Sequence, residues 1–287
     1  VESGEIIEEK HVEKIQAINL RSLKISEEMG DKDKAKGTLN NIGNFYREKG
    51  DYSEALKYYI RSKTICEELK DKYNVGYPKW NIGCIYLRSV EYDKALTIFN
   101  DTLIESKQVN NREIIARIYA STGQILCEIG SYDEAIEKFN HSLIVRHELG
   151  FKPHIEFINY WIGRSYYHKA NYEKSDEYFN RCINIQKEIG DTSAEDTLNH
   201  AIHLQLMCKM QGTTYDKTKI IALIKEVPNP DLYLNFRVYQ LLEDTAYLET
   251  AYNQVQEKAD NLEPDVKAKF LSYPIPKAIV EEWEKVK

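Results

Sequence analysis

The stretch from Gly43 to Tyr59, GNFYREKGDYSEALKYY, contains the pattern that decides the fold. Its key positions return every 40 residues in four columns: Gly43, Gly83, Gly123 and Gly163; Tyr52, Tyr92, Tyr132 and Tyr172; Ala55, Ala95, Ala135 and Ser175; Tyr59, Phe99, Phe139 and Phe179. A fixed period of about 20 to 50 residues is the signature of an array of stacked repeats. Several independent columns in one register predict four clear copies.

Each copy is expected to form two helices. The first helix of the first copy, residues 34–49, carries apolar or small residues at three- and four-residue spacings: Leu39, Ile42, Gly43 and Tyr46. Gly50 is expected to end this helix as a C-cap, and Ser53 to cap a second helix that ends near Leu69. The small residues of the Gly and Ala columns let the two helices approach closely. The aromatic column is expected to fill the space between neighbouring repeats.

These columns resemble the tetratricopeptide repeat family. Its units carry a small residue in the first helix, Tyr near the end of that helix, a Gly-Asp-Tyr turn, and then Ala and an aromatic residue in the second helix. The matching residues are Gly43, Tyr46, Gly50, Asp51, Tyr52, Ala55 and Tyr59 in copy one; Gly83, Tyr86, Tyr92, Ala95 and Phe99 in copy two; Gly123, Gly130, Tyr132, Ala135 and Phe139 in copy three; and Gly163, Tyr166, Tyr172 and Phe179 in copy four. The resemblance implies an all-α fold, a right-handed α-solenoid of helix-turn-helix repeats.

The repeats are longer than the family's commonest unit of about 34 residues. In this they are similar to those of bacterial peptide-receptor regulators, kinesin light chain and polarity adaptors. We expect a single solenoid domain over residues 1–287. Its expected parts are an incomplete repeat (4–30), clear repeats (34–70, 74–110, 113–150 and 153–190), degenerate repeats (193–260) and C-terminal capping helices (261–287). In the cap, Ile279, Val280 and Trp283 form an apolar stripe that seals the last repeat.

The composition of the chain indicates which classes of partner it binds and in which cellular compartment it works. The chain is 42% hydrophobic and 30% charged, with a net charge of -7. Binding to nucleic acid or to an anionic membrane needs a basic stripe, so neither is expected. No apolar run is long enough to span a bilayer, and no secretory signal is visible. The five cysteines form no Cys-x-x-Cys pair, which favours reduced thiols in a cytoplasmic protein.

The resemblance places the binding surface on the concave face that the first helices of the repeats line. In the family's register, the expected peptide- or partner-binding residues are Asn40, Asn41, Asn44, Arg47, Tyr77, Trp80, Asn81, Arg88, Arg117, Gln124, Tyr160, Trp161, Arg164 and Tyr167. An Asn amide can donate to a peptide carbonyl and accept from a peptide N–H. Arginines could pair with ligand carboxylates, and Trp or Tyr could supply buried contact area. The alternative is that Asn81 and Trp161 simply pack between repeats.

Three narrower functions are disfavoured. A carboxylate clamp for chaperone tails would use Asn44, Asn81 and Arg117, but two further basic positions are occupied by Asn40 and Ser121. A metal site could be imagined at His200, His203 and Cys208, but no further ligand has a useful spacing. No catalytic motif is present, so we expect no enzyme activity, no cofactor and no metal.

We therefore expect a module that binds another protein or a peptide in the concave groove. The alternative is a regulatory or sensor region of a larger signalling protein, such as a cyclase, kinase, ATPase or transcription regulator, and the missing initiator Met motivates it. A peptide-controlled phosphatase ranks last, because the similar bacterial proteins carry an N-terminal helical bundle and only one helix is expected before these repeats. The oligomeric state cannot be read from the sequence.

Overall fold

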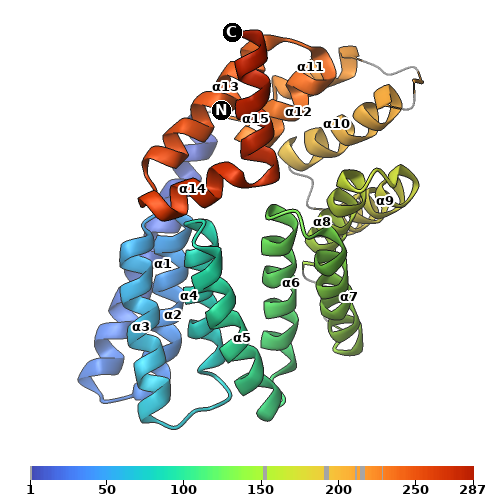
Figure 1. Cartoon of the computed structure of the whole chain (residues 1–287). Helices are drawn as coiled ribbons and strands as arrows, with labels where there is room; N and C mark the ends of the chain where they lie inside the picture. Colours follow the sequence, from blue (N-terminus) through green and yellow to red (C-terminus); the bar gives the residue numbers. More distant parts are fainter. Residues whose placement is uncertain (1, 151–153, 191–193, 211, 214–216, 228) are drawn as a thin grey trace. The chain divides into compact units, whose positions relative to one another are not determined.

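The computed structural model describes residues 2–150, 154–190, 194–210, 212–213, 217–227 and 229–287 (Figure 1). Within these ranges every regular element is an α-helix, and there are fifteen of them. The chain divides into two compact units, residues 1–121 and 122–287. The boundary falls inside one helix, α6, which spans Arg112–Glu128.

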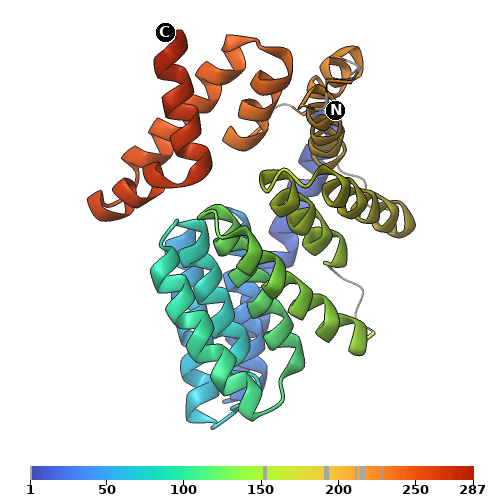
Figure 2. The same cartoon turned by 45° about the vertical axis from the view of Figure 1, so that its right-hand side comes forward.

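The first unit is built from helix pairs. It contains α1 (Glu2–Glu28), α2 (Lys32–Glu48), α3 (Tyr52–Glu68), α4 (Gly76–Arg88), α5 (Tyr92–Gln108) and the first part of α6. α2 packs on α3 and α4 packs on α5, as antiparallel pairs that lie side by side in both views (Figures 1 and 2). α1 packs on α2. α2 and α3 are the two helices expected for copy one, and α4 and α5 are the two expected for copy two.

The glycine column is explained by the aromatic column. The rings of Tyr59, Phe99, Phe139 and Phe179 are fully buried. A Cβ atom placed on Gly43 would come within 2.5 Å of the Tyr59 ring, and one on Gly123 within 2.9 Å of the Phe139 ring. Larger residues are therefore excluded, because real side-chain contacts are not this short. Tyr59 also packs with Ile82 and Ile85 of the next copy, so the ring fills the space between repeats as predicted.

The start of the second helix differs from the prediction. Gly50 ends α2 in the left-handed conformation (φ +79°), where glycine has no steric penalty. The N-cap of α3 is Asp51, not Ser53, because the Asp51 side chain accepts from the backbone N–H of Glu54. The left-handed glycine reverses the chain at once, so the helix begins at Tyr52 and Ser53 already lies inside it.

The second unit continues with helix pairs and ends in two short helices. It contains the end of α6, α7 (Tyr132–Glu148), α8 (Ile155–His168), α9 (Tyr172–Ile189), α10 (Ala194–Met210), α11 (Lys217–Ile224), α12 (Leu232–Leu242), α13 (Thr245–Asp260), α14 (Pro264–Ser272) and α15 (Pro274–Val286). A core of buried aliphatic side chains, including Ile202, Leu234 and Val238, joins α10, α11 and α12. The reading of 193–260 as degenerate repeats, like the single-domain reading of the chain, stays a prediction.

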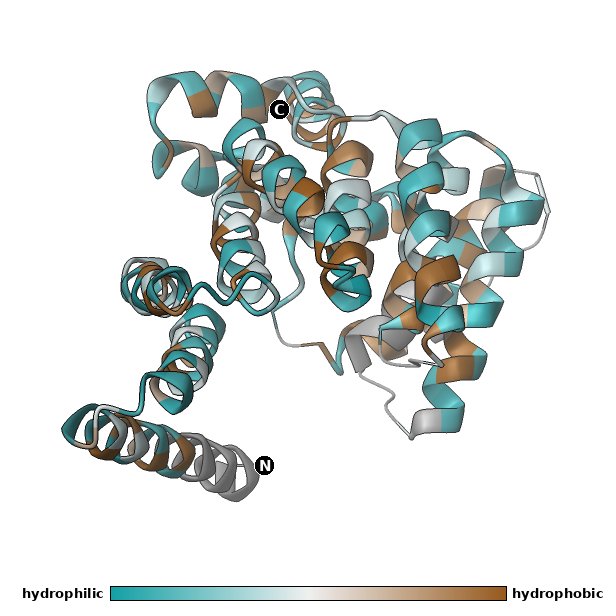
Figure 3. Cartoon of the chain, turned by 90° about the horizontal axis from the view of Figure 1, so that it is seen from below, coloured by the Kyte–Doolittle hydropathy of each residue, from teal (hydrophilic) through white to brown (hydrophobic). Residues whose placement is uncertain are grey.

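The last helix covers α13 through the apolar stripe that the sequence indicates. Ile279 is fully buried, and the Trp283 ring stacks on Tyr252 of α13 with 5.4 Å between ring centres. Hydrophilic and hydrophobic residues alternate along the helices, as amphipathic packing requires (Figure 3). Across the residues that the structure describes, no helix combines the length and the apolar character needed to cross a membrane.

Candidate functional site

Polar side chains of α2, α4 and α6 contact one another across the first unit. Asn81 Nδ2 donates to Asn40 Oδ1 at 2.9 Å, and Asn81 Oδ1 accepts from Arg47 Nη1 at 3.0 Å, which ties α4 to α2. Trp80 Nε1 donates to Ser121 Oγ of α6 at 3.0 Å. We name this set the polar ladder and define it as Asn40, Arg47, Tyr77, Trp80, Asn81, Glu113, Arg117 and Ser121.

The carboxylate of Glu113 links α4 to α6 within the ladder. Tyr77 OH donates to Glu113 Oε2 at 2.8 Å, and Arg117 Nη2 donates to Glu113 Oε1, also at 2.8 Å. The Arg117 guanidinium lies over the Trp80 ring, 4.9 Å from its centre. Burial, and next the contact with Glu113, raises the pKa of Tyr77, so the phenol stays protonated at neutral pH. The predicted residues that meet in this ladder are Asn40, Arg47, Tyr77, Trp80, Asn81 and Arg117.

Exposure separates the predicted residues of the first unit into three groups: buried, half-buried and exposed. Asn81 is only 3% exposed and uses both atoms of its amide inside the ladder. This geometry fits the alternative in which Asn81 joins neighbouring repeats. Asn41 and Arg88 are exposed, and the other predicted residues of this unit are half-buried. A partner can therefore reach the hydrogen-bonding groups of the exposed and half-buried residues, whereas those of Asn81 are used within the protein.

Asn44 has a local structural partner. Its Oδ1 accepts from the hydroxyl of Tyr59 at 2.7 Å. Tyr59 is the one member of the aromatic column with a hydroxyl, and burial raises its pKa. A buried hydroxyl needs a partner, so Asn44 completes the packing of its own repeat. Contact between Asn44 and a binding partner stays a prediction.

A small pocket of about 200 Å³ opens beside the ladder. Three of the predicted residues, Asn40, Asn41 and Tyr77, line it together with Lys36, Gly37, Ser62, Cys66, Asn74 and Pro78. Burial raises the pKa of the Cys66 thiol to about 11, so this thiol is neutral at physiological pH. The groups that line the pocket thus include amides, a phenol and an uncharged sulfur.

An ion pair between α2 and the α3–α4 turn stands next to this pocket. Lys36 Nζ contacts the Asp71 carboxylate. Burial alone would lower the pKa of Lys36, but hydrogen bonds to Asp33 and Asp71 raise it to about 12. Burial would raise the pKa of Asp71, but hydrogen bonds from Lys36 and Asn74 hold it at about 2. Both groups are therefore charged over the whole physiological range.

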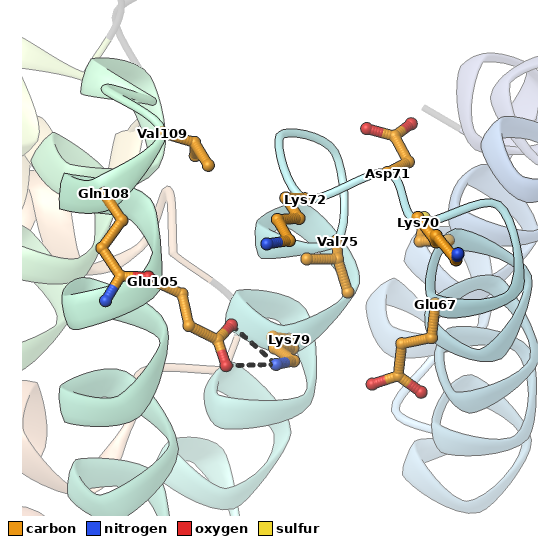
Figure 4. A pocket seen from close by; sticks show the side chains of 10 residues that line it. Glu67, Lys70, Asp71, Lys72, Val75, Lys79, Glu105, Gln108 and Val109 are labelled. Atoms are coloured by element: carbon orange, nitrogen blue, oxygen red, sulfur yellow. Dashed lines mark hydrogen bonds and ion pairs between the residues drawn. The ribbon is translucent and has the colours of Figure 1, made fainter.

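A second pocket of the first unit was not anticipated from the sequence. It has a volume of about 360 Å³ and is lined by Cys66, Glu67, Lys70, Asp71, Lys72, Val75, Lys79, Glu105, Gln108 and Val109 (Figure 4). Lys79 Nζ of α4 bridges both carboxylate oxygens of Glu105 of α5, at 2.7 and 2.8 Å. The signal for this pocket is the long connection from α3 to α4, where Lys70 and Asp71 stand in place of a Gly-Asp turn.

In the second unit, α12 covers the predicted residues of α8. Arg164 pairs with Glu128 at 3.1 Å, and its guanidinium lies between the rings of Trp161 and Tyr233, 4.6 and 4.7 Å from their centres. Tyr233 OH of α12 donates to the second oxygen of Glu128 at 2.5 Å. Arg164 is 4% exposed and Trp161 is 6% exposed. The carboxylate that Arg164 was expected to find on a ligand is thus supplied by the chain itself.

The remaining predicted residues of the second unit lie at the edge of this cluster. The Tyr160 hydroxyl accepts from Arg237 Nη1 of α12 at 3.4 Å. Tyr160, Tyr167 and Gln124 are half-buried. Sequence reasoning missed Glu128, Tyr233 and Arg237, because the last two lie beyond the clear repeats and share no period with them.

Two family models described as tetratricopeptide repeats match the sequence, over residues 37–103 and over residues 158–189. Both ranges lie in the regions where the 40-residue columns were found and where the structure has helix pairs. Over these two ranges the chain carries tetratricopeptide repeats.

Solved structures of the same architecture resemble this repeat protein. BtubC (BKLC) from P. vanneervenii aligns with a TM-score of 0.60 and 18% identity, over 76% of this chain and 94% of that one. The apo form of RapI aligns with a TM-score of 0.56 and 14% identity, over 94% and 99%. A Rap protein complexed with competence and sporulation factor aligns with a TM-score of 0.58 and 17% identity, over 88% and 66%. These likenesses concern the fold, an all-α repeat solenoid. No curated protein sequence matches the repeat protein.

His203 of α10 packs among aromatic rings. His203 is fully buried, with its ring 4.5 Å from the Phe179 ring and 5.2 Å from the Tyr167 ring. The side chain of His200 lies outside the described residues. Among the side chains that the structure describes, no three His, Cys, Asp or Glu residues are grouped as metal ligands would be.

Proposed function

We propose that the surface formed by α2, α4 and α6 in the first unit holds an extended segment or helix of a partner protein. The observation that carries this proposal is the polar ladder with its adjoining pocket of about 200 Å³. Half-buried amide, guanidinium and aromatic groups are held in fixed positions by one another. A surface ordered before binding loses less conformational entropy when a partner docks.

The chemistry of this surface suits a peptide backbone with polar side chains. Asn41 is exposed and can both donate and accept, which matches a peptide unit. Arg88 is exposed at the far end of α4 and can pair with a carboxylate of the partner. Trp80 and Tyr77 add aromatic area of the kind that dominates binding energy at interfaces.

The comparisons support a binding role at a coarse level. Tetratricopeptide repeats give each unit stacked helix pairs, and stacked repeats commonly use such surfaces for binding. One solved structure of similar fold is a Rap protein complexed with competence and sporulation factor. That complex belongs to the Rap protein, and its identity to this chain is 17%.

The test begins with capture of partners on the full chain and mapping of the bound segment. The affinity of that segment is then measured for Asn41→Ala and Arg88→Ala. Both side chains are exposed, so substitution should leave the fold intact. We expect each variant to weaken binding by about tenfold, because each removes a hydrogen bond or an ion pair.

Lys57→Ala provides the matched control. Lys57 is exposed on α3, and its described contact is with Glu54 of the same helix. The Lys57→Ala variant should bind the partner segment with unchanged affinity. If Lys57→Ala weakens binding while Asn41→Ala and Arg88→Ala do not, the partner lies on the second helices and the proposed surface is wrong.

A further inference from the structure

The second unit contains a pocket that shares no residue with the polar ladder. Its volume is about 390 Å³, within the range of about 300–1,000 Å³ typical of small-molecule sites. The end of α8, the α8–α9 turn, the end of α10, α12 and the start of α15 contribute to its lining. Tyr233, Phe236, Pro274 and Ile275 give it aromatic and aliphatic walls.

Two phenols that line this pocket donate to a weak acceptor. Tyr167 OH and Tyr172 OH both contact Met210 Sδ, at 3.7 and 3.2 Å. A thioether sulfur accepts hydrogen bonds poorly compared with an oxygen. Both hydroxyls would therefore gain from an oxygen ligand, and most of all from an anionic one, because charged acceptors form the stronger bonds.

The pocket wall also carries positive charge. Arg237 carries the positive charge among the residues that line the pocket, and it is only 4% exposed. Arg237 Nη1 donates to the Tyr160 hydroxyl at 3.4 Å. Arg164 of α8 pairs with Glu128 at 3.1 Å. A buried guanidinium acts more strongly on an anion than an exposed one, because screening by water is weaker.

The lining residue His168 has an unsatisfied polar atom. His168 Nε2 is buried and makes no hydrogen bond. Its ring stacks on Tyr132, with 5.1 Å between ring centres. Buried polar atoms without a partner are rare in native proteins, so this nitrogen is a second, independent indication of a ligand.

We propose that this pocket binds a carboxylate attached to an aromatic or branched apolar group. The carboxylate is held by Arg237 and the hydroxyls of Tyr167 and Tyr172, and the apolar group packs against Phe236 and Ile275. A free C-terminal residue of a peptide and a small aromatic acid share this chemistry. The pocket does not depend on the function proposed for the first unit.

The first experiment measures binding of N-acetyl-L-phenylalanine and of N-acetyl-L-phenylalaninamide to the full chain by NMR titration. The two probes differ only in the carboxylate. We expect the acid to bind with a dissociation constant in the millimolar range and the amide to bind at least tenfold more weakly. Equal binding of the two probes, or binding of neither, overturns the proposal.

A peptide of five glycines followed by phenylalanine, with a free carboxylate, separates the two sources of the ligand. Affinity equal to or higher than that of N-acetyl-L-phenylalanine assigns the pocket to peptide C-termini. Affinity at least tenfold lower assigns it to free acids, because the preceding chain is then excluded. In both cases the pocket binds a carboxylate attached to an apolar group, as proposed.

Variants locate the binding. Tyr172→Phe keeps the ring and removes one donor, and Arg237→Gln removes the charge; each should weaken binding of the acid by about tenfold or more. Tyr178→Phe is the matched control, because Tyr178 is a half-buried tyrosine of the same helix α9 that stacks on Tyr166, outside the pocket. If Arg237→Gln unfolds, Tyr172→Phe decides alone. Unchanged affinity of Tyr172→Phe together with unchanged affinity of any folded Arg237→Gln means that the acid binds elsewhere, and the proposal fails.

Discussion

At the scale of single residues, the repeat is defined by the contact of a glycine with a ring. Gly43 and Gly37 both lie in α2, and their surroundings differ completely. A Cβ on Gly43 would meet the Tyr59 ring at 2.5 Å, whereas a Cβ on Gly37 would meet nothing within 4 Å. Helix propensity favours alanine at both positions, so packing alone distinguishes them.

This contrast gives a paired prediction. Gly43→Ala should lower the free energy of unfolding by about 1–3 kcal/mol, because the added methyl group displaces a fully buried ring. Gly37→Ala should raise it by about 0.5–1 kcal/mol through helix propensity. Urea denaturation followed by circular dichroism measures both. Equal stabilisation by the two substitutions would mean that the ring of Tyr59 does not press on α2.

The 40-residue period could be recognised in the sequence because the contact with the aromatic ring permits only glycine at its position. Glycine, alanine and the aromatic ring recur wherever two helices cross in the same way, so the helix pairs of copies one and two were predicted. The packing of α12 against α8 was not predicted. Tyr233 and Arg237 meet Glu128 and Tyr160 through contacts more than 70 residues apart in sequence, and such contacts leave no periodic trace.

At the scale of the element, the choice of cap shows a second limit of sequence reasoning. Asp51 and Ser53 are both good N-cap residues, and sequence alone does not rank them. The left-handed Gly50 decides, because it places Asp51 where its carboxylate reaches the N–H of Glu54 at 3.0 Å. Asp31 caps α2 in the same way, with its side chain 3.0 Å from the N–H of Lys34.

The cap can be tested by substitution at both positions. Asp51→Ala should lower the free energy of unfolding by about 1 kcal/mol, because it leaves an N-terminal N–H of α3 without its acceptor. Ser53→Ala should change it by no more than about 0.5 kcal/mol, since Ser53 already lies within the helix. Denaturation curves of the two variants provide the comparison. A larger loss for Ser53→Ala would restore Ser53 as the cap.

At the scale of the whole molecule, neighbouring repeats are joined by polar contacts as well as by buried rings. In a solenoid, stability is approximately the sum of repeat stabilities and nearest-neighbour interface contributions. Asn81 lies at such an interface, because its amide joins Asn40 and Arg47 of α2 to α4. Asn41, exposed on α2, belongs to the proposed binding surface. We therefore expect stability and partner binding to depend on different asparagines of the first unit.

Asn81→Ala should consequently affect the coupling between repeats. We expect the first unit to lose about 1–3 kcal/mol, because the amide of Asn40 and the guanidinium of Arg47 lose a buried partner. The unfolding transition should also become broader, as α2–α3 and α4–α5 begin to open separately. Hydrogen exchange of α2 and α4 amides measures this directly, with faster exchange in α2 than in α4 as the expected result. Asn41→Ala should leave both exchange rates unchanged, and equal effects of the two variants would mean that the Asn81 contacts do not couple the repeats.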